Sequence, residues 1–143
     1  MTVAAILNEK GRNVVTANPG DSLADVCAVL AEKRIGAIVV TDRSAGAKGI
    51  MSERDVVRAI AREGAAALTK PVSTFMTREV VSCSEEDTNA TLMAKMTEGK
   101  FRHMPVLRGN RLVGIVSIGD VVKRRIAEAE FEAQAMREYI ATG

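Results

Sequence analysis

Gly49-Ile50-Met51-Ser52-Glu53-Arg54-Asp55 is the stretch that decides the fold, because it returns later in the chain as Gly114-Ile115-Val116-Ser117-Ile118-Gly119-Asp120. In each copy, a short apolar run of strand size leads into Ser-x-x-Asp. That pattern is typical of a helix that begins with a side-chain cap. Two such strand-to-helix junctions predict a chain built from two similar repeats.

The elements around each junction also repeat. Val14-Val15-Thr16 returns as Val80-Val81-Ser82, and a turn-like acidic stretch follows each. A predicted helix comes next in each copy, with Ser22 and Thr88 as the expected N-caps. The predicted strand pairs are Ala37–Val40 with Gly49–Met51, and Met104–Leu107 with Leu112–Val116, joined by turns at residues 43–47 and 109–110. The unit is therefore β-α-β-β-α, and it occurs twice. This predicts an α+β fold with pseudo-two-fold symmetry.

We expect the first repeat, with an N-terminal helix, at residues 3–70. The second is expected at residues 71–143, with a linker helix before it and an extended C-terminal helix after it. Gly64 to Thr77 contains Gly64, Pro71 and a short apolar pattern, which predicts a linker with about one helical turn. The last helix keeps an apolar face past the end of the repeat. We expect that face to pack on a partner subunit or back across the module.

Composition excludes several classes of protein. The 143 residues are 47% hydrophobic, which suits a packed globule, and the net charge is only +2. Near-neutral charge and 3% aromatic residues argue against nucleic-acid binding. No apolar run approaches the length of a membrane span, and the N-terminal sequence does not resemble a secretion signal, so a cytoplasmic location is expected.

Cysteine and histidine content argues against metal sites. Cys27 and Cys83 have no CxxC spacing, which favours neither a disulfide framework nor a zinc site. We expect Cys27 in the core and Cys83 to be partly exposed. His103 is the single histidine, so a histidine-rich metal site is excluded.

The Ser-x-x-Asp junctions have two interpretations. A carboxylate can accept hydrogen bonds from both hydroxyls of a ribose, and a helix N-terminus presents free N–H groups that suit a phosphate. One turn of backbone can thus hold both parts of a nucleotide. The alternative is that each junction is only a helix cap, although capping and binding can coexist.

The two junctions resemble the G-h-h-[S/T]-x-x-D signature that ends each repeat of a CBS-domain pair, also called a Bateman module. The resemblance covers nearly the whole chain, from about Val3 to Arg125. It implies that nucleotides bind in clefts between the repeats. One site would use Ser117 and Asp120 with Thr16, Ile35, Gly36 and Ala37. The other would use Ser52, Arg54 and Asp55 with Ser82, Phe101, Arg102 and His103. In each, serine would hold phosphate, aspartate would hold ribose, and Thr16 or Ser82 would bind the base edge, with Ile35 or Phe101 as apolar cover.

The two predicted sites are chemically unequal. Arg54 stands where the second signature has Gly119, and Arg102-His103 stand where the first copy has Gly36-Ala37. These side chains are candidates for phosphate contact. The alternatives are a solvated residue at a helix start for Arg54 and surface salt bridging for Arg102. The difference predicts two sites of different affinity or ligand choice.

Sequence motifs for catalysis are missing. The chain has no Walker A, Rossmann, nucleophile-elbow or HExxH pattern, so we expect no enzyme activity, no catalytic cofactor and no metal. The resemblance implies a regulatory module that binds an adenine nucleotide. AMP is the preferred candidate, and ADP, ATP and NAD(H) are alternatives. A homodimer and an effector protein of unknown identity are the expected partners. The competing hypotheses are a ligand-independent dimerisation or adaptor domain and, less favoured, nucleic-acid binding.

Overall fold

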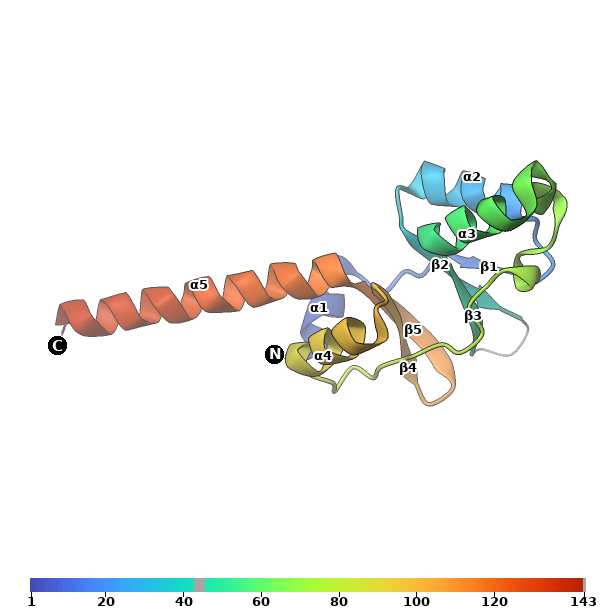
Figure 1. Ribbon diagram of the computed structural model, residues 1–143. Coiled ribbons are helices and arrows are strands. Elements are labelled where there is room, and N and C mark those ends of the chain that lie inside the picture. Colours follow the sequence, from blue (N-terminus) through green and yellow to red (C-terminus); the bar gives the residue numbers. More distant parts are fainter. Residues whose placement is uncertain (43–45, 143) are drawn as a thin grey trace.

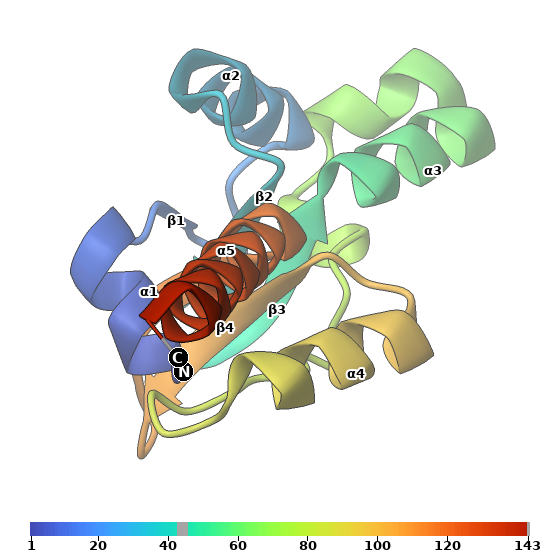
Figure 2. The same ribbon diagram turned by 90° about the vertical axis from the view of Figure 1, so that its left-hand side faces the viewer.

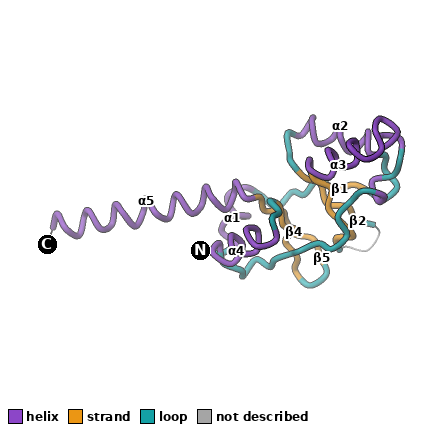
Figure 3. The backbone as a smooth tube through the Cα atoms, viewed as in Figure 1, coloured by secondary structure: helices purple, strands orange, loops and turns teal. Residues whose placement is uncertain are grey.

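The computed structural model describes residues 1–42 and 46–142 and places two similar halves side by side (Figure 1). The first half contains β1 (Thr16–Ala17), α2 (Leu23–Lys33), β2 (Ala37–Thr41), β3 (Ala47–Ser52) and α3 (Glu53–Glu63). The second contains α4 (Asn89–Gly99), β4 (His103–Arg108), β5 (Arg111–Ser117) and α5 (Ile118–Thr142). α1 (Val3–Lys10) precedes the first half, and the 3-10 helices η1 (Gly64–Thr69) and η2 (Val72–Thr74) lie in the connection. Figure 3 shows the long loop that follows η2 into the second half.

The first repeat forms a three-stranded sheet in the order β1-β2-β3, with α2 and α3 together on one of its sides (Figure 1). β2 lies in the middle, parallel to β1 and antiparallel to β3. Its residues from Ala37 to Val40 are all buried, as expected for a central strand. β3 alternates instead, so Met51 enters the core and Ser52 is left half-buried at the strand end. Of the predicted turn between these strands, Arg43, Ser44 and Ala45 lie outside the described residues.

The second repeat keeps only part of its predicted sheet. β4 and β5 form an antiparallel hairpin, and Gly109 in its tight turn has φ of 63°, a conformation that glycine adopts without strain. The strand predicted at Val80-Val81-Ser82 does not form. A single parallel bridge joins Cys83 to Val106, one residue beyond the predicted strand. Val80 and Val81 line a cavity between the repeats and do not pair with β4.

In each repeat, the segment ahead of the β-α-β-β-α elements packs in the core of the other repeat. Val3, Ile6 and Leu7 of α1 lie in the core of the second repeat, whereas Val72 and Met76 of the connection lie in the core of the first. The boundary at residue 70 therefore divides the chain in sequence, but each core takes side chains from both sides of it. Such an exchange holds the two repeats together as one unit.

The signature glycines allow this exchange. A Cβ atom on Gly49 would lie 2.5 Å from Met76 Sδ, and one on Gly114 would lie 2.8 Å from Leu7 Cδ2. Both distances are shorter than real Cβ atoms show, so each glycine makes room for the segment that crosses from the neighbouring repeat. The first residue of the signature is thus a packing requirement, independent of any ligand.

The helix caps formed as expected, whereas the burial of the two cysteines differs from the expectation. Ser22 Oγ accepts from Asp25 N at 3.1 Å and Thr88 Oγ1 accepts from Thr91 N at 3.2 Å, which confirms both N-caps. The expectation for the cysteines was wrong in its ranking, because Cys83 is buried and Cys27 is only half-buried. Cys83 is buried because it joins β4 through its backbone, so its side chain enters the second core. Both are free thiols.

α5 is a single helix of 25 residues, and it projects far beyond the second repeat (Figure 1). Figure 2 shows it nearly end-on. Only Val121 is fully buried, and every residue from 129 to 142 is exposed. The prediction of an extended C-terminal helix is confirmed. The projecting part of α5 does not pack back across the module, which was one of the two expectations for its apolar face. Among the described residues, no helix combines the length and apolarity needed to span a bilayer.

Candidate functional site

Both Ser-x-x-Asp junctions form helix caps. Asp55 N donates to Ser52 Oγ at 3.3 Å and Ser52 N donates to Asp55 Oδ2 at 2.9 Å. In the second copy, Asp120 N donates to Ser117 Oγ at 3.2 Å and Ser117 N donates to Asp120 Oδ2 at 2.9 Å. The capping interpretation is therefore correct for both junctions. It does not remove the capacity to bind a ligand, because an ionised carboxylate has about four acceptor positions.

The two junctions meet the starts of β2 and β4 in the same way. Glu53 N donates to Gly36 O at 3.0 Å, and Ile118 N donates to Arg102 O at 2.8 Å. The strand starts also contact each other, since a Cβ atom on Gly36 would lie 3.1 Å from the His103 ring. The repeats thus join where the pseudo-two-fold symmetry brings equivalent loops together, and the first junction faces a cavity between the repeats.

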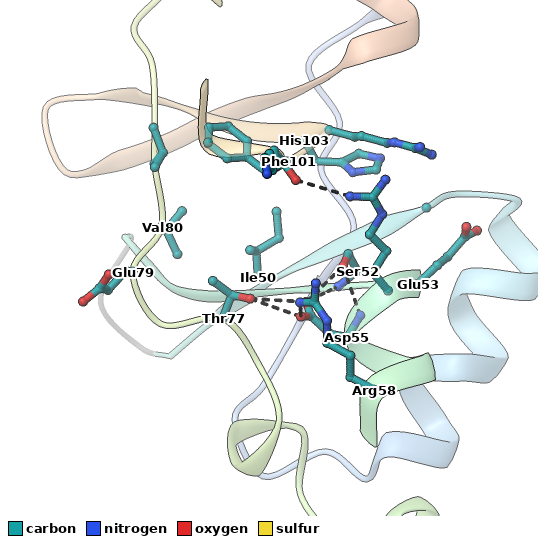
Figure 4. A pocket seen from close by; sticks show the side chains of 16 residues that line it. Ile50, Ser52, Glu53, Asp55, Arg58, Thr77, Glu79, Val80, Phe101 and His103 are labelled. Carbon is teal, nitrogen blue, oxygen red and sulfur yellow. Dashed lines mark hydrogen bonds and ion pairs between the residues drawn. The ribbon is translucent and has the colours of Figure 1, made fainter. Parts of the chain in front are cut away.

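A cavity of about 460 Å³ occupies the gap beside the first junction (Figure 4). This volume lies within the range of small-molecule sites. One side is apolar, formed by Ile50, Val80 and Phe101. The described residues that line it are Gly36, Ile50, Ser52, Glu53, Arg54, Asp55, Arg58, Thr77, Glu79, Val80, Val81, Gly99, Lys100, Phe101, Arg102 and His103. They come from β3, α3, the connection and the loop between α4 and β4, so the cavity exists only when both repeats are in place.

Basic side chains reach the cavity from both repeats. Arg54 and Arg58 lie one turn apart on α3, and Lys100 and Arg102 come from the second repeat. Arg54 Nη1 donates to Lys100 O at 3.3 Å, which links the repeats across the site. Three acidic groups also line it, so the surroundings combine positive charge with carboxylates rather than forming a uniform field.

Asp55 is the buried carboxylate of this cavity, with 7% of its surface exposed. Besides the Ser52 amide, Oδ2 accepts from Ser52 Oγ at 3.0 Å. Oδ1 accepts from Thr77 Oγ1 at 3.2 Å and lies 3.7 Å from Arg58 Nη1 (Figure 4). A hydroxyl can rotate and exchange partners, so the Thr77 contact can be replaced by a hydroxyl of a ligand.

The second junction has a different partner. Lys10 Nζ donates to Asp120 Oδ2 at 2.7 Å and to Ile115 O at 3.0 Å. Partial burial alone would raise the pKa of Asp120, but the Lys10 ammonium and the Ser117 amide outweigh it, and the pKa lies below its ordinary value. In the first copy, Ile50 pairs with the backbone of Thr77, and the Thr77 side chain reaches Asp55. Lys10 thus takes the place that Thr77 has in the first copy.

His103 lies between the two junctions. Burial lowers its pKa below the ordinary value, although Glu53 and Asp120 act in the opposite direction. The ring is half-buried beside Gly36 and lines the cavity beside the first junction. A neutral imidazole at this point has one donor and one acceptor nitrogen, and it can hydrogen-bond a ligand without adding charge.

The structure brings together most of the residues predicted for the site that contains Ser52 and Asp55. Ser52, Arg54, Asp55, Phe101, Arg102 and His103 all line the cavity, whereas Ser82 is not among its lining residues. Gly36, predicted for the other site, lines this one. Of the other predicted residues, Thr16 is exposed on β1, Ile35 is half-buried beside the first core, and Ala37 is buried. The assignment of residues to the second cleft stays a prediction.

Sequence reasoning missed Thr77, Arg58 and Lys10. The Arg58 position had a signal, because it follows Arg54 by four residues on a predicted helix and shares its face. Thr77 and Lys10 had none in the repeat alignment. Both lie ahead of the β-α-β-β-α elements of their repeats and reach the junctions through tertiary packing.

The comparisons with known proteins identify the family. The sequence pattern of the CBS domain matches residues 5–62 and 72–127. CBS domain-containing protein CBSX3, mitochondrial, of Arabidopsis thaliana is 29% identical over 99% of this chain and 73% of its own length. In longer relatives from the same plant, the matched region is 22% of the protein.

Solved structures agree with this match. The CBS-domain containing protein ATU1752 from Agrobacterium tumefaciens has a TM-score of 0.85 and 48% identity, covering 87% of this chain and 99% of its own. CBS domain protein PAE2072 from Pyrobaculum aerophilum, solved in complex with AMP, has a TM-score of 0.75 and 26% identity, covering 84% of this chain and 89% of its own. With two matched repeats, exchanged cores and paired Ser-x-x-Asp junctions, the chain belongs to the CBS-domain family.

Proposed function

We propose that the chain is a non-catalytic regulatory module that binds an adenine nucleotide in the cavity beside Ser52 and Asp55. The observation that carries the proposal is the combination in one cavity of an apolar wall, a buried carboxylate and two arginines on one helix face. These are the three chemical requirements of a base, a ribose and a phosphate. The AMP complex of PAE2072 supports the same class of ligand.

The ribose is assigned to Asp55. Its carboxylate is fixed by the Ser52 amide and hydroxyl, so it can accept from ribose hydroxyls with little loss of side-chain entropy. The Thr77 hydroxyl gives way to the ligand. The base lies against Ile50, Val80 and Phe101, where apolar contact excludes water.

The phosphate is assigned to the N-terminus of α3. The Glu53 and Asp55 amides already donate to Gly36 O and Ser52 Oγ, so the attraction for an anion comes from the positive end of the helix dipole. Arg54 adds a guanidinium that can bind a phosphate with two parallel hydrogen bonds. Arg102 approaches from the second repeat. A bound nucleotide would therefore contact both repeats, and its occupancy could alter how they are held together.

The experiment is isothermal titration calorimetry of the purified protein with AMP, ADP, ATP and NAD(H). Arg54→Gln should weaken the binding of every phosphate-bearing ligand and leave the binding of adenosine unchanged. Arg62→Gln is the matched control, because Arg62 is exposed on the same helix and is not among the cavity residues. Absence of binding by all these nucleotides would overturn the proposal. AMP is the preferred ligand, and the titration also ranks it against the dinucleotide and ATP.

The adaptor hypothesis makes the opposite prediction. A ligand-independent dimerisation domain would show the same oligomeric state and partner binding with or without nucleotide, and it would tolerate Asp55→Asn in every assay. The exposed apolar face of α5 is the one observation that favours it. An effector protein and a cytoplasmic location remain predictions, and one relative carries the word mitochondrial in its name.

A further inference from the structure

The outer part of α5 is not covered by any other part of the described chain. Past Glu128, every described residue of the helix is exposed, up to Thr142. An isolated helix of about 12–15 residues is marginal in water, since its stability comes mainly from packing an apolar face. A continuous helix at this position therefore implies a surface that covers it.

The exposed face of α5 carries a heptad pattern. Its apolar positions are Val122, Ile126, Ala129, Ala133, Met136 and Ile140, separated alternately by four and three residues. The four large members are 40%, 54%, 60% and 70% exposed, in chain order. Alternating spacing of this kind forms the a and d positions of a coiled coil. We propose that α5 pairs with α5 of a second copy of this chain in a parallel, in-register, two-stranded coiled coil.

Contacts of α5 with its own repeat leave this face free. Val121 is buried, Arg124 Nη1 is 3.2 Å from Glu9 Oε2, and Asn89 Nδ2 donates to Glu128 Oε1 at 3.4 Å. These three positions lie on one side of the helix. Val122 and Ile126 lie about a third to nearly half of a turn away from it, given about 100° per residue. The stripe therefore begins beside the body and continues unbroken along the projecting part.

Charges beside the stripe choose the parallel arrangement. With Ile126 and Ile140 at a, the g positions are Arg125 and Glu132, and the e positions five residues later are Glu130 and Arg137. In a parallel pair, each g residue faces the following e residue of the other helix. Arg125 then faces Glu130 of the partner subunit, and Glu132 faces Arg137 of the partner subunit. Both pairs are attractive, and symmetry repeats each of them.

The antiparallel arrangement that uses the whole stripe has the opposite charge pattern. There, g residues face g residues and e residues face e residues. Glu132 would face Glu132 of the partner subunit, Glu130 would face its own copy, and Lys123 would face Arg137 of the partner subunit. Like charges directly opposite are destabilising, so a second copy in parallel orientation is the occupant that the surface fits.

The orientation is tested by cysteine cross-linking in full-length protein carrying Cys27→Ser, because Cys27 is the less buried of the two native thiols. Ile140→Cys places a thiol at an a position, where in-register parallel pairing brings the two copies together. Phe131→Cys is the matched control on the opposite face of the same helix, where the side chain is 77% exposed. We expect rapid disulfide-linked dimer at position 140 and slow cross-linking at 131. Equal rates at the two positions would overturn the proposal.

The charge pattern is tested by sedimentation equilibrium over a range of concentrations, without nucleotide. Glu132→Arg should weaken the dimer on the order of tenfold, because two symmetric pairs change from attractive to repulsive. Adding Arg137→Glu to the same chain should restore it. A dimer that is unaffected by Glu132→Arg, or a double variant no stronger than the single one, would contradict the parallel coiled coil. The proposal rests on α5 alone, so its outcome is independent of nucleotide binding.

Discussion

Asp55→Asn separates the two roles of the first junction. Asparagine keeps the shape of the side chain, and its Oδ1 can still accept from Ser52 N, so the helix cap should survive with a stability loss of about 1 kcal/mol or less. The carboxylate charge is lost. Hydrogen bonds to a charged group contribute about 1 kcal/mol more than neutral ones. With two hydrogen bonds from ribose hydroxyls to this side chain, the binding free energy weakens by about 2 kcal/mol, which is roughly a thirtyfold increase in Kd.

The assay for this prediction is calorimetric titration with AMP, accompanied by thermal unfolding of each variant. Asp21→Asn is the matched control, because Asp21 Oδ2 accepts from Asn18 N at 2.9 Å in a turn outside the cavity. Asp21→Asn should lower the stability of the protein about as much as Asp55→Asn does, and it should leave the Kd for AMP unchanged. Asp120→Asn isolates any contribution from the second junction. If Asp55→Asn binds AMP like the wild type, or if Asp21→Asn loses as much affinity, the ribose assignment is wrong.

Three further predictions concern pH, packing and thiols. Because burial lowers the pKa of His103 below 6.5, the unfolded chain binds a proton more readily than the folded one, so the associated stability is present above pH 6.5 and lost as pH falls below it. His103→Gln should remove that slope in urea titrations, and an unchanged slope would refute it, since no other histidine exists. Gly114→Ala should destabilise by about 1–3 kcal/mol through its clash with Leu7, whereas Gly20→Ala, with open space around it, should have little effect on the urea midpoint. Burial, followed by the nearby Asp87, raises the pKa of the Cys83 thiol to about 12, so maleimide should label Cys27 first in the native protein, and mass spectrometry that found Cys83 labelled equally fast would contradict its burial.

Local patterns were sufficient to predict most of the fold. The helices capped by Ser22, Ser52 and Thr88 depend on caps and apolar spacing within a few residues, and the structure contains all three. The first strand of the second repeat was mispredicted for a tertiary reason. Val80 and Val81 have strong strand propensity, but they line the cavity instead, and only Cys83 reaches β4.

The cavity residues were predictable where the repeat itself carries them. Ser52, Arg54 and Asp55 follow from the junction, and Phe101 to His103 follow from the equivalent strand start. Thr77 was not predictable, because its contact with Asp55 depends on the connection crossing into the first core. Aligning the two repeats compares equivalent positions, and it does not reveal a segment of one repeat that packs on the other.

The inequality of the two junctions has a physical origin that the signatures themselves do not show. Asp55 is fixed by uncharged donors from Ser52 and Thr77, with one guanidinium 3.7 Å away, so its charge is available to a ligand. Asp120 is paired with the Lys10 ammonium at 2.7 Å. A ribose at the second junction would have to compete with an ion pair, whereas at the first it replaces a rotatable hydroxyl. Occupancy should therefore begin at Asp55, and the residue that sets this order is Lys10, at the end of α1.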